Sequence, residues 1–254
     1  MLVIFYGCLA PRLNLFDVAA FGQAKKAVKG VRKPDRERWQ PKSRLPRHTH
    51  ANAYIAVVLD GQYSEIGDRG RLQLTTGSAA FHGPYESHQN HFGQKGAEVL
   101  NLPVEAWYGW ENSVARVSDP DFIVRVAEKD PREAVDCLME MSSPQPCLTS
   151  HWIDEVAADL LLDPTLRLDQ CAKTRGIAAE SLSRVFRQTF GISPRRFRAD
   201  IRAQCALRAI ISSARPLARI ACEVGFADQA HMTRALRALT GRTPRAWRAS
   251  TASP

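Results

Sequence analysis

The 254-residue sequence has no long apolar run. No stretch approaches the roughly 18 consecutive apolar residues from which a membrane-spanning helix is inferred. The apolar start, residues 1–10, has no basic segment before it and is too short for a normal signal peptide. These absences predict a cytoplasmic protein with no membrane partner.

Paired cysteines are also missing. No two of the six cysteines form a C-x-x-C pair, and their scatter does not indicate a zinc site or a disulfide framework. Cys171, Cys205 and Cys222 fall on the apolar stripes of expected helices, which predicts buried small hydrophobic residues. Cysteine used in this way fits a reducing compartment.

The first 148 residues have almost no excess of positive charge, with a net charge of +1. Residues 149–254 contain 17 Lys and Arg against 9 Asp and Glu, which gives a net charge of +8. This distribution is expected of a duplex-binding domain joined to a domain with another task. Binding to a membrane surface would need a broad aromatic or leucine face beside the charge, which this sequence does not show.

The basic part of the chain contains an internal repeat. Residues 176–198 and 225–248 align at an offset of fifty, which pairs glycine, proline and arginine positions as well as apolar ones. The matched pairs are Arg184 with Arg234, Arg187 with Arg237, Gly191 with Gly241, Pro194 with Pro244, Arg195 with Arg245 and Arg198 with Arg248. Gly176 and Gly225, which open the copies, are forty-nine apart, so the second copy has one extra residue in its turn.

Each copy has the pattern of a helix-turn-helix motif. Apolar residues recur at helical spacing, at Leu182, Val185, Phe186 and Phe190 in the first copy and at Met232, Ala235, Leu236 and Leu239 in the second. A short apolar helix and a glycine-containing turn precede each stripe, and the second helix of such a motif enters the major groove. Between the copies, Ser193-Pro194 predicts the start of a helix that ends near Ser212.

The helix faces opposite the stripes are the candidate DNA-binding surfaces. They present Glu180, Ser183, Arg184, Arg187 and Gln188 in the first copy, and Gln229, His231, Thr233, Arg234 and Arg237 in the second. Arginine can form two hydrogen bonds with guanine, and glutamine two with adenine, so these faces suit base readout. The alternative is a solvated, arginine-rich surface without a partner; repetition of the arginine positions favours DNA binding.

The repeated segment resembles the DNA-binding domain of the AraC/XylS family of bacterial transcription regulators. The match covers about the last 100 residues and rests on Ile220-Ala221, Gly225-Phe226, Asp228-Gln229, His231 to Arg234, Thr240-Gly241 and Thr243-Pro244. The resemblance implies base contacts mainly from Glu180, Ser183 and Arg184 in the first copy, and from Gln229, His231, Thr233 and Arg234 in the second. One departure is Ala178, where the family often has a serine that caps the first reading helix.

Residues 39–112 have a β-rich pattern. Residues 53–59 predict an apolar strand closed by a hairpin at Asp60-Gly61. Further short strands are expected at residues 62–65, 71–74, 79–82 and 97–102, and this spacing predicts a small barrel or jelly roll. Residues 1–38 show no clear period and are interpreted as a poorly ordered extension.

Histidines cluster in this β-rich region. The segments RHTHANAYIAVVLDGQY (residues 47–63) and GSAAFHGPYESHQ (residues 77–89) resemble the cupin sensor domain of many AraC-type regulators. Metal-binding cupins place two histidines and a glutamate in the first segment and a third histidine in the second. Here His48, His50 and His88 match, but Tyr54 occupies the glutamate position.

Three interpretations of the cluster remain open. His48, His50 and His88 could hold a divalent metal, since imidazole is a common ligand. In the favoured interpretation, no cofactor is present and a pocket for an organic effector is lined by His48, His50, Tyr54, His82 and His88. A purely structural role is the third.

The sequence therefore predicts an α+β protein of two domains. Helices are expected at residues 119–141, broken at Pro131, and at residues 151–162, with a linker at residues 142–146. The predicted order is an extension (1–38), a cupin-like sensor barrel (39–112), a helical dimerisation or linker region (113–147) and an all-α domain with two helix-turn-helix motifs (148–254).

The favoured function is a transcription regulator that binds promoter DNA sequence-specifically and responds to a small effector, without enzymatic activity. The resemblance implies a homodimer and, for an activator, RNA polymerase as further partners. The alternative is a cupin-type metal-binding protein or enzyme with an accessory DNA-binding domain. The missing glutamate counts against that alternative.

Overall fold

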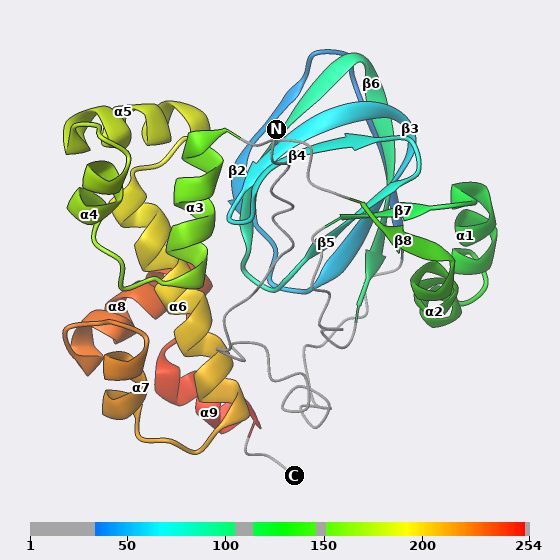
Figure 1. The fold of residues 1–254 in the computed structure, drawn as a ribbon. Coiled ribbons are helices and arrows are strands. Elements are labelled where there is room, and N and C mark those ends of the chain that lie inside the picture. The colour runs from blue at the N-terminus through cyan, green and yellow to red at the C-terminus, as the bar shows by residue number, and fades with distance from the viewer. Residues whose placement is uncertain (1–33, 105–113, 146–150, 252–254) are drawn as a thin grey trace.

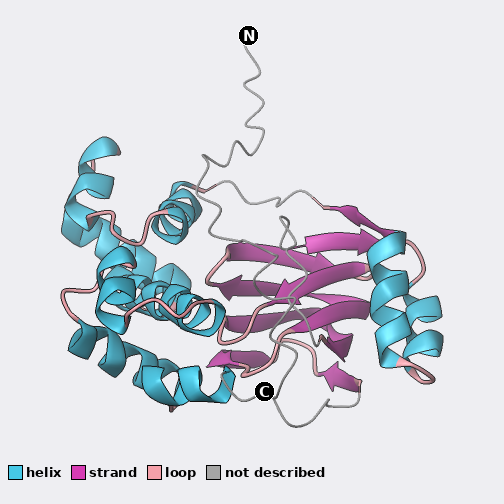
Figure 2. Cartoon of the chain, turned by 90° about the horizontal axis from the view of Figure 1, so that it is seen from below, coloured by secondary structure: helices cyan, strands magenta, loops and turns pink. Residues whose placement is uncertain are grey.

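A computed structural model describes residues 34–104, 114–145 and 151–251. An antiparallel β-sheet lies between two groups of helices (Figures 1 and 2). Helices α1 (Pro120–Ala127) and α2 (Pro131–Met141) lie on one side of the sheet, and α3 to α9 lie on the other. The chain thus has a sheet domain followed by a helical domain. Most of the predicted extension, the predicted boundaries at residues 112 and 147, and Cys8 and Cys147 lie outside the described residues.

Two long strands form the centre of the sheet. Strands β3 (Tyr54–Gly67) and β6 (Ser87–Pro103) pair along most of their length. The other strands flank this pair: β1 (Asp35–Trp39) and β2 (Arg44–Thr49) on β6, and β4 (Gly70–Thr75) and β5 (Ser78–His82) on β3. Beyond β5 the edge is extended by β7 (Val114–Val117) and β8 (Ser142–Pro144). The predicted extension and linker therefore each contribute residues to a strand.

The sheet curls but its strand pairing does not close. Its order is β1-β6-β3-β5-β7-β8, so within the described residues the predicted closed barrel is not confirmed. The predicted hairpin at Asp60-Gly61 is wrong, because β3 continues through it with register shifts that mark bulges. Gly61 has φ 76°, and a Cβ there would lie 2.2 Å from the carbonyl oxygen of Gly96, which only glycine permits. The chain reverses instead between Gly67 and Gly70.

The apolar run of β3 is explained by burial on both faces of the sheet. Ile55 and Val57 pack in a core shared with α1 and α2, whereas Ala56 and Val58 pack with Tyr63 and other residues of the opposite face. Successive residues of a strand point to opposite faces, so a strand covered on both faces loses the usual alternation of polar and apolar residues.

The helical domain has two separate cores on one shared helix. Its helices are α3 (Trp152–Leu162), α4 (Leu168–Thr174), α5 (Ala179–Phe190), α6 (Pro194–Ser212), α7 (Leu217–Glu223), α8 (Gln229–Thr240) and α9 (Pro244–Thr251). The first core contains Phe186 and the start of α6, while the second contains Leu236 and the later turns of α6. The helices expected at residues 119–141, 151–162 and 194–212 are confirmed.

Cysteine burial follows the helix faces only in part. Cys171 is buried and Cys205 half-buried, but Cys222 is exposed, so its predicted burial is wrong. On α7 the buried residues are Ile220 and Ala221, and Cys222 is directed away from them. None of the helices in the described part of the chain has the length and apolar character needed to cross a membrane.

Candidate nucleic-acid interface and histidine cluster

The two repeat copies form the same turn. Gly176 has φ 64° and is followed by Ile177, whose amide donates to the carbonyl of Ala172 at 3.1 Å. Forty-nine residues later Gly225 has φ 82°, and the amide of Phe226 donates to the carbonyl of Ala221 at 2.9 Å. Both glycines adopt the left-handed conformation that a residue with a side chain rarely takes.

The second helix of each motif also ends in the same way. Gly191 and Gly241 have φ 72° and 73°, and their amides donate to the carbonyls of Arg187 and Arg237 at 3.0 and 2.8 Å. Such left-handed C-terminal glycines satisfy carbonyl groups at the end of a helix. The internal repeat of the sequence is therefore a repeat of structure.

The N-terminal caps of α5 and α8 differ. The carboxylate of Asp228 accepts a hydrogen bond from the amide of His231 at 2.6 Å and caps α8. Ala178 occupies the same position before α5 and provides no side-chain hydrogen bond. The extra residue in the second turn brings Asp228 to the cap, and α5 starts without an equivalent.

An Ala178→Ser variant is expected to raise the free energy of unfolding by about 1 kcal/mol, the usual value of a cap hydrogen bond. Ala178 is exposed and has extended backbone angles suited to a cap, so serine meets no steric obstacle. Urea denaturation of the full chain measures the change. Ala178→Val, which cannot accept a hydrogen bond, is the control; equal stability of the two variants would contradict the prediction.

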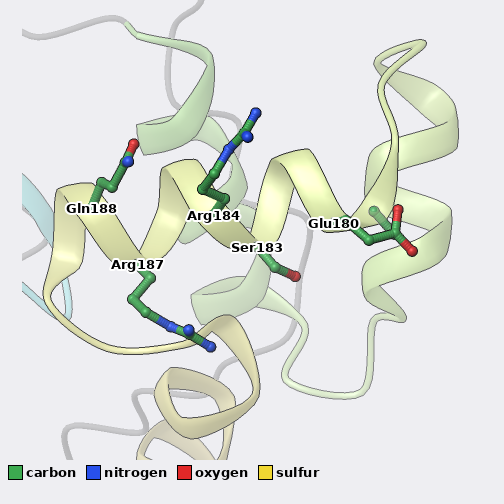
Figure 3. A pocket seen from close by; sticks show the side chains of 6 residues that line it. Glu180, Ser183, Arg184, Arg187 and Gln188 are labelled. Carbon is green, nitrogen blue, oxygen red and sulfur yellow. The ribbon is translucent and has the colours of Figure 1, made fainter.

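The exposed face of α5 carries the side chains predicted to bind DNA (Figure 3). Leu182, Phe186 and Phe190 are buried on its opposite face. Figure 3 shows Arg184 and Gln188 extending to one side of the helix and Arg187 to the other. The face thus presents cations on both of its edges.

The equivalent face of α8 is partly engaged within the protein. Gln229, His231, Arg234 and Arg237 are exposed. The His231 ring packs edge-on against Phe226, with ring centroids 5.1 Å apart, and the Thr233 hydroxyl donates to the carbonyl of Gln229 at 2.8 Å. Gln229 and the two arginines therefore remain the most accessible of the predicted contacts.

Four arginines at equivalent positions of the two motifs have no partner among the residues that the structure describes. Over residues 34–104, 114–145 and 151–251, no hydrogen bond or ion pair engages the side chains of Arg184, Arg187, Arg234 and Arg237. Other arginines of the domain are held by the protein, as Arg196 is by the carboxylate of Asp200 and Arg198 by the carbonyl of Leu166. The unpaired guanidinium groups lie on the exposed faces of α5 and α8, the helices that would enter the major groove.

The structure brings together the five predicted pocket residues of the sheet domain. The ring centroids of Tyr54 and His82 lie 4.5 Å apart, those of His48 and His88 4.4 Å, and those of His50 and Tyr54 4.7 Å. The Tyr54 hydroxyl is 3.2 Å from Nε2 of His88. The cluster is a single group of aromatic rings at the end of β2, the start of β3, the end of β5 and the start of β6.

Glu65 is a member of this cluster that sequence reasoning missed. Its Oε2 lies 3.6 Å from Nε2 of His82, and its side chain is buried. Burial raises the pKa of Glu65 to about 8 and lowers the pKa of His82 to about 3, so both groups are neutral at pH 7. Eleven residues separate Glu65 from Tyr54, about 36 Å in a straight strand, so the curl of β3 brings them together.

Polar contacts join this region to the helical domain. The carboxylate of Asp68, only 3% exposed, pairs with Arg47 of β2 and accepts hydrogen bonds from the Ser87 amide at 2.8 Å and from Gln204 Nε2 of α6 at 2.7 Å. Burial raises the pKa of Asp68 to about 6 although Arg47 opposes the rise, so the group is ionised at pH 7. None of these residues was predicted to have a role.

Two further ion pairs extend this interface between the domains. Arg71 of β4 forms hydrogen bonds of 2.6 to 3.2 Å with the carboxylate of Asp154 on α3. Glu86, just before β6, lies 4.0 Å from Arg208 of α6 and also pairs with Arg69. The sheet domain therefore contacts α6, the helix on which the cores of both motifs pack.

Two helix-turn-helix motifs on one shared helix define the class of the helical domain. Residues 171–250 match the family model described as a helix-turn-helix domain. The arabinose operon regulatory protein of Escherichia coli (strain K12) is 24% identical over 172 residues, which cover 68% of this chain and 56% of that protein. The chain is thus similar to AraC-type transcription regulators, and it spans about half the length of this relative.

Solved structures of similar fold include a transcriptional regulator with an AraC-type DNA-binding domain from Chromobacterium violaceum. It is 24% identical, with a TM-score of 0.37, covering 41% of this chain and 94% of its own. ToxT from Vibrio cholerae is 8% identical, with a TM-score of 0.42, covering 87% of this chain and 100% of its own.

Proposed function

We propose that this chain is a sequence-specific DNA-binding transcription regulator in which α5 and α8 enter successive segments of the major groove. The observation that carries the proposal is the set of four unpaired, exposed arginines at equivalent positions of two matching motifs, defined above. A helical domain with a net charge of +8 supplies the attraction to the phosphate backbone. The AraC-type proteins to which the chain is similar are regulators.

The arginines have two different roles in this proposal. Arg184 and Arg234 lie in the N-terminal half of their helices, from which base edges are contacted in helix-turn-helix complexes. Arg187 and Arg237 lie nearer the C-terminal ends and bind phosphates, which fixes the register of the helices. Glu180, Ser183, Gln229, His231 and Thr233 supply the remaining contacts to bases.

The sheet domain controls the reading helices through α6. Asp68 contacts Gln204 of that helix and Glu86 contacts Arg208. Asp68 lies three residues from Glu65, and Glu86 lies two residues from His88. A ligand that favours one arrangement of this interface over another shifts the DNA-binding equilibrium by its difference in affinity for the two arrangements. An effector bound in the sheet domain could therefore change the position of α6, and with it both motifs, through these contacts.

An Arg234→Ala variant is expected to bind its selected DNA sequence roughly 5- to 150-fold more weakly, which corresponds to about 1–3 kcal/mol. The sequence is first selected from a random duplex pool with the full chain, and affinities are then measured by fluorescence anisotropy at fixed salt. Discrimination at one base position should relax, because one pair of hydrogen bonds to a base edge is lost.

Arg125→Ala, on α1, is the matched control, because it removes the same charge from an exposed site on the other side of the sheet. It should leave the affinity unchanged. An equal loss on the selected and on random DNA would make Arg234 a phosphate contact. Failure of the full chain to enrich any sequence would refute the proposed function.

A further inference from the structure

We propose that Glu65, His82 and His88 form a binding site for one divalent first-row transition metal ion, for which Zn²⁺ serves as the probe. The three side chains come from β3, β5 and β6, and they converge within the sheet domain. The proposal depends on the residues of this domain only and is independent of DNA binding.

The donor atoms are close to the separations that a metal requires. The ligand atoms of the three residues all lie within 4.8 Å of one another, and Glu65 Oε2 is 3.6 Å from His82 Nε2. Two ligands with bonds of about 2.1 Å at the tetrahedral angle are about 3.4 Å apart. Glu65 and His82 are thus already placed as neighbouring ligands, and His88 offers the third ligand atom within 4.8 Å of both.

Each of the three residues has an unsatisfied polar atom. Within the described part of the chain, Glu65 Oε2, His82 Nε2 and His88 Nδ1 are buried and make no hydrogen bond. Their residues are only 3% to 4% exposed. Buried polar atoms without partners are costly and rare in native proteins. A single bound cation would satisfy all three.

The space beside these atoms suits an ion better than an organic molecule. Glu65, His82 and His88 line a cavity of about 10 Å³, whose wall also includes the ion-paired Arg69 and Glu86. One water molecule needs a cavity of roughly 10 to 15 Å³. An organic effector would require the site to open, whereas an ion would not.

Tyr54 provides the supporting contact that metal-ligating histidines usually have. Its hydroxyl is 3.2 Å from Nε2 of His88, and its ring stacks on His82 at a centroid distance of 4.5 Å. The nitrogen of His88 that does not face the metal is therefore held in place, as in many metal sites. Tyr54 is a positioning residue, and the carboxylate comes from Glu65, further along the same strand.

The donor set also suits the charge of a dication. Glu65 contributes a carboxylate beside the two imidazoles. The carboxylate of Glu86, which pairs with Arg69, lies nearby in the same buried region.

A second donor set shares His88 and has to be distinguished from the first. His48, His50 and His88 also lie within 4.8 Å of one another, but His48 and His50 are only half-buried and the set contains no carboxylate. The charge and burial of the Glu65 set make it the stronger site.

The test uses the full chain purified without an affinity tag, stripped with a chelator and titrated with Zn²⁺ by calorimetry and with Co²⁺ by visible absorption. One equivalent should bind, and the Co²⁺ spectrum should show ligand-field bands of nitrogen and oxygen donors. Glu65→Gln and His82→Gln should each weaken binding more than about 100-fold, beyond the usual effect of losing a supporting contact. Tyr54→Phe should weaken it about 10-fold, and His48→Gln should leave it unchanged.

Thermal unfolding of the stripped proteins checks that each variant folds. Glu65→Gln is expected to fold, because the carboxyl that it replaces is neutral without metal and glutamine has nearly the same shape. Binding that survives in the folded Glu65→Gln and His82→Gln variants but disappears in His48→Gln would overturn the proposal in favour of the other donor set. Failure of the wild-type chain to bind either ion would overturn it as well and leave Glu65 and His82 as a buried pair.

Discussion

An Asp68→Ala variant is expected to lose about 3 kcal/mol of unfolding free energy and to release α6 from the sheet domain. The substitution removes the partner of Arg47 and the acceptor of two hydrogen bonds, one from the Ser87 amide and one from Gln204. Breaking a buried ion pair from one side costs about 3–5 kcal/mol. The lower end is expected, because the carboxylate itself bears a desolvation cost that raises its pKa.

Chemical denaturation measures the stability change, and hydrogen exchange measures the protection of α6 amides in the native chain. Gln204→Ala should reproduce the loosening of α6 with a smaller loss of stability, about 1 kcal/mol, since the Arg47 pair stays intact. Asp60→Ala removes an exposed carboxylate from β3, the strand that ends just before Asp68, and serves as the control. Unchanged exchange of α6 in Asp68→Ala would show that this interface does not hold the domains together.

A Phe186→Ala variant is expected to lose about 3–5 kcal/mol, the cost of removing a phenylalanine side chain from a core. Phe186 is fully buried, with ring centroids 4.4 Å from Phe190 and 5.2 Å from Phe197. The loss should be confined to the first motif, because the core of the second is a different set of residues. Footprinting on selected DNA should lose the segment read by α5 and retain the segment read by α8.

Val185→Ala is the matched control for this variant. Val185 lies beside Phe186 on α5 but is only half-buried, so its substitution should cost much less and leave both footprints in place. Simultaneous loss of both footprints in Phe186→Ala would show that the two motifs fold as one cooperative unit.

The helical domain could be predicted from sequence because its signals are local. A helical stripe such as Leu182-Phe186, a C-terminal glycine such as Gly191 and the Ser193-Pro194 start each fix one feature within a few residues. The internal repeat shows each of these signals a second time, in residues 225–248. The absent cap at Ala178 was visible for the same reason, since a cap is a property of one position.

The sheet domain was predicted less well because its features depend on residues far apart in the chain. Asp60-Gly61 has the composition of a hairpin turn, but pairing with β6 decides that it is a bulge. Glu65 joins the histidines only because β3 curls, and no local pattern predicts that curl. Asp68 and Gln204 are 136 residues apart, so their contact could not be found from spacing.

The placement of α6 between the two cores has a consequence for the cost of binding. A flexible tether between two DNA-reading modules loses conformational freedom when the second module binds, and its length sets an effective concentration. Here a 19-residue helix, packed into one core at its start and into the other toward its end, fixes the relative position of the modules before any contact forms. On the proposed function, little ordering entropy is lost when both bind, so the two affinities combine almost fully on a correctly spaced site. The same stiffness excludes sites whose spacing is wrong.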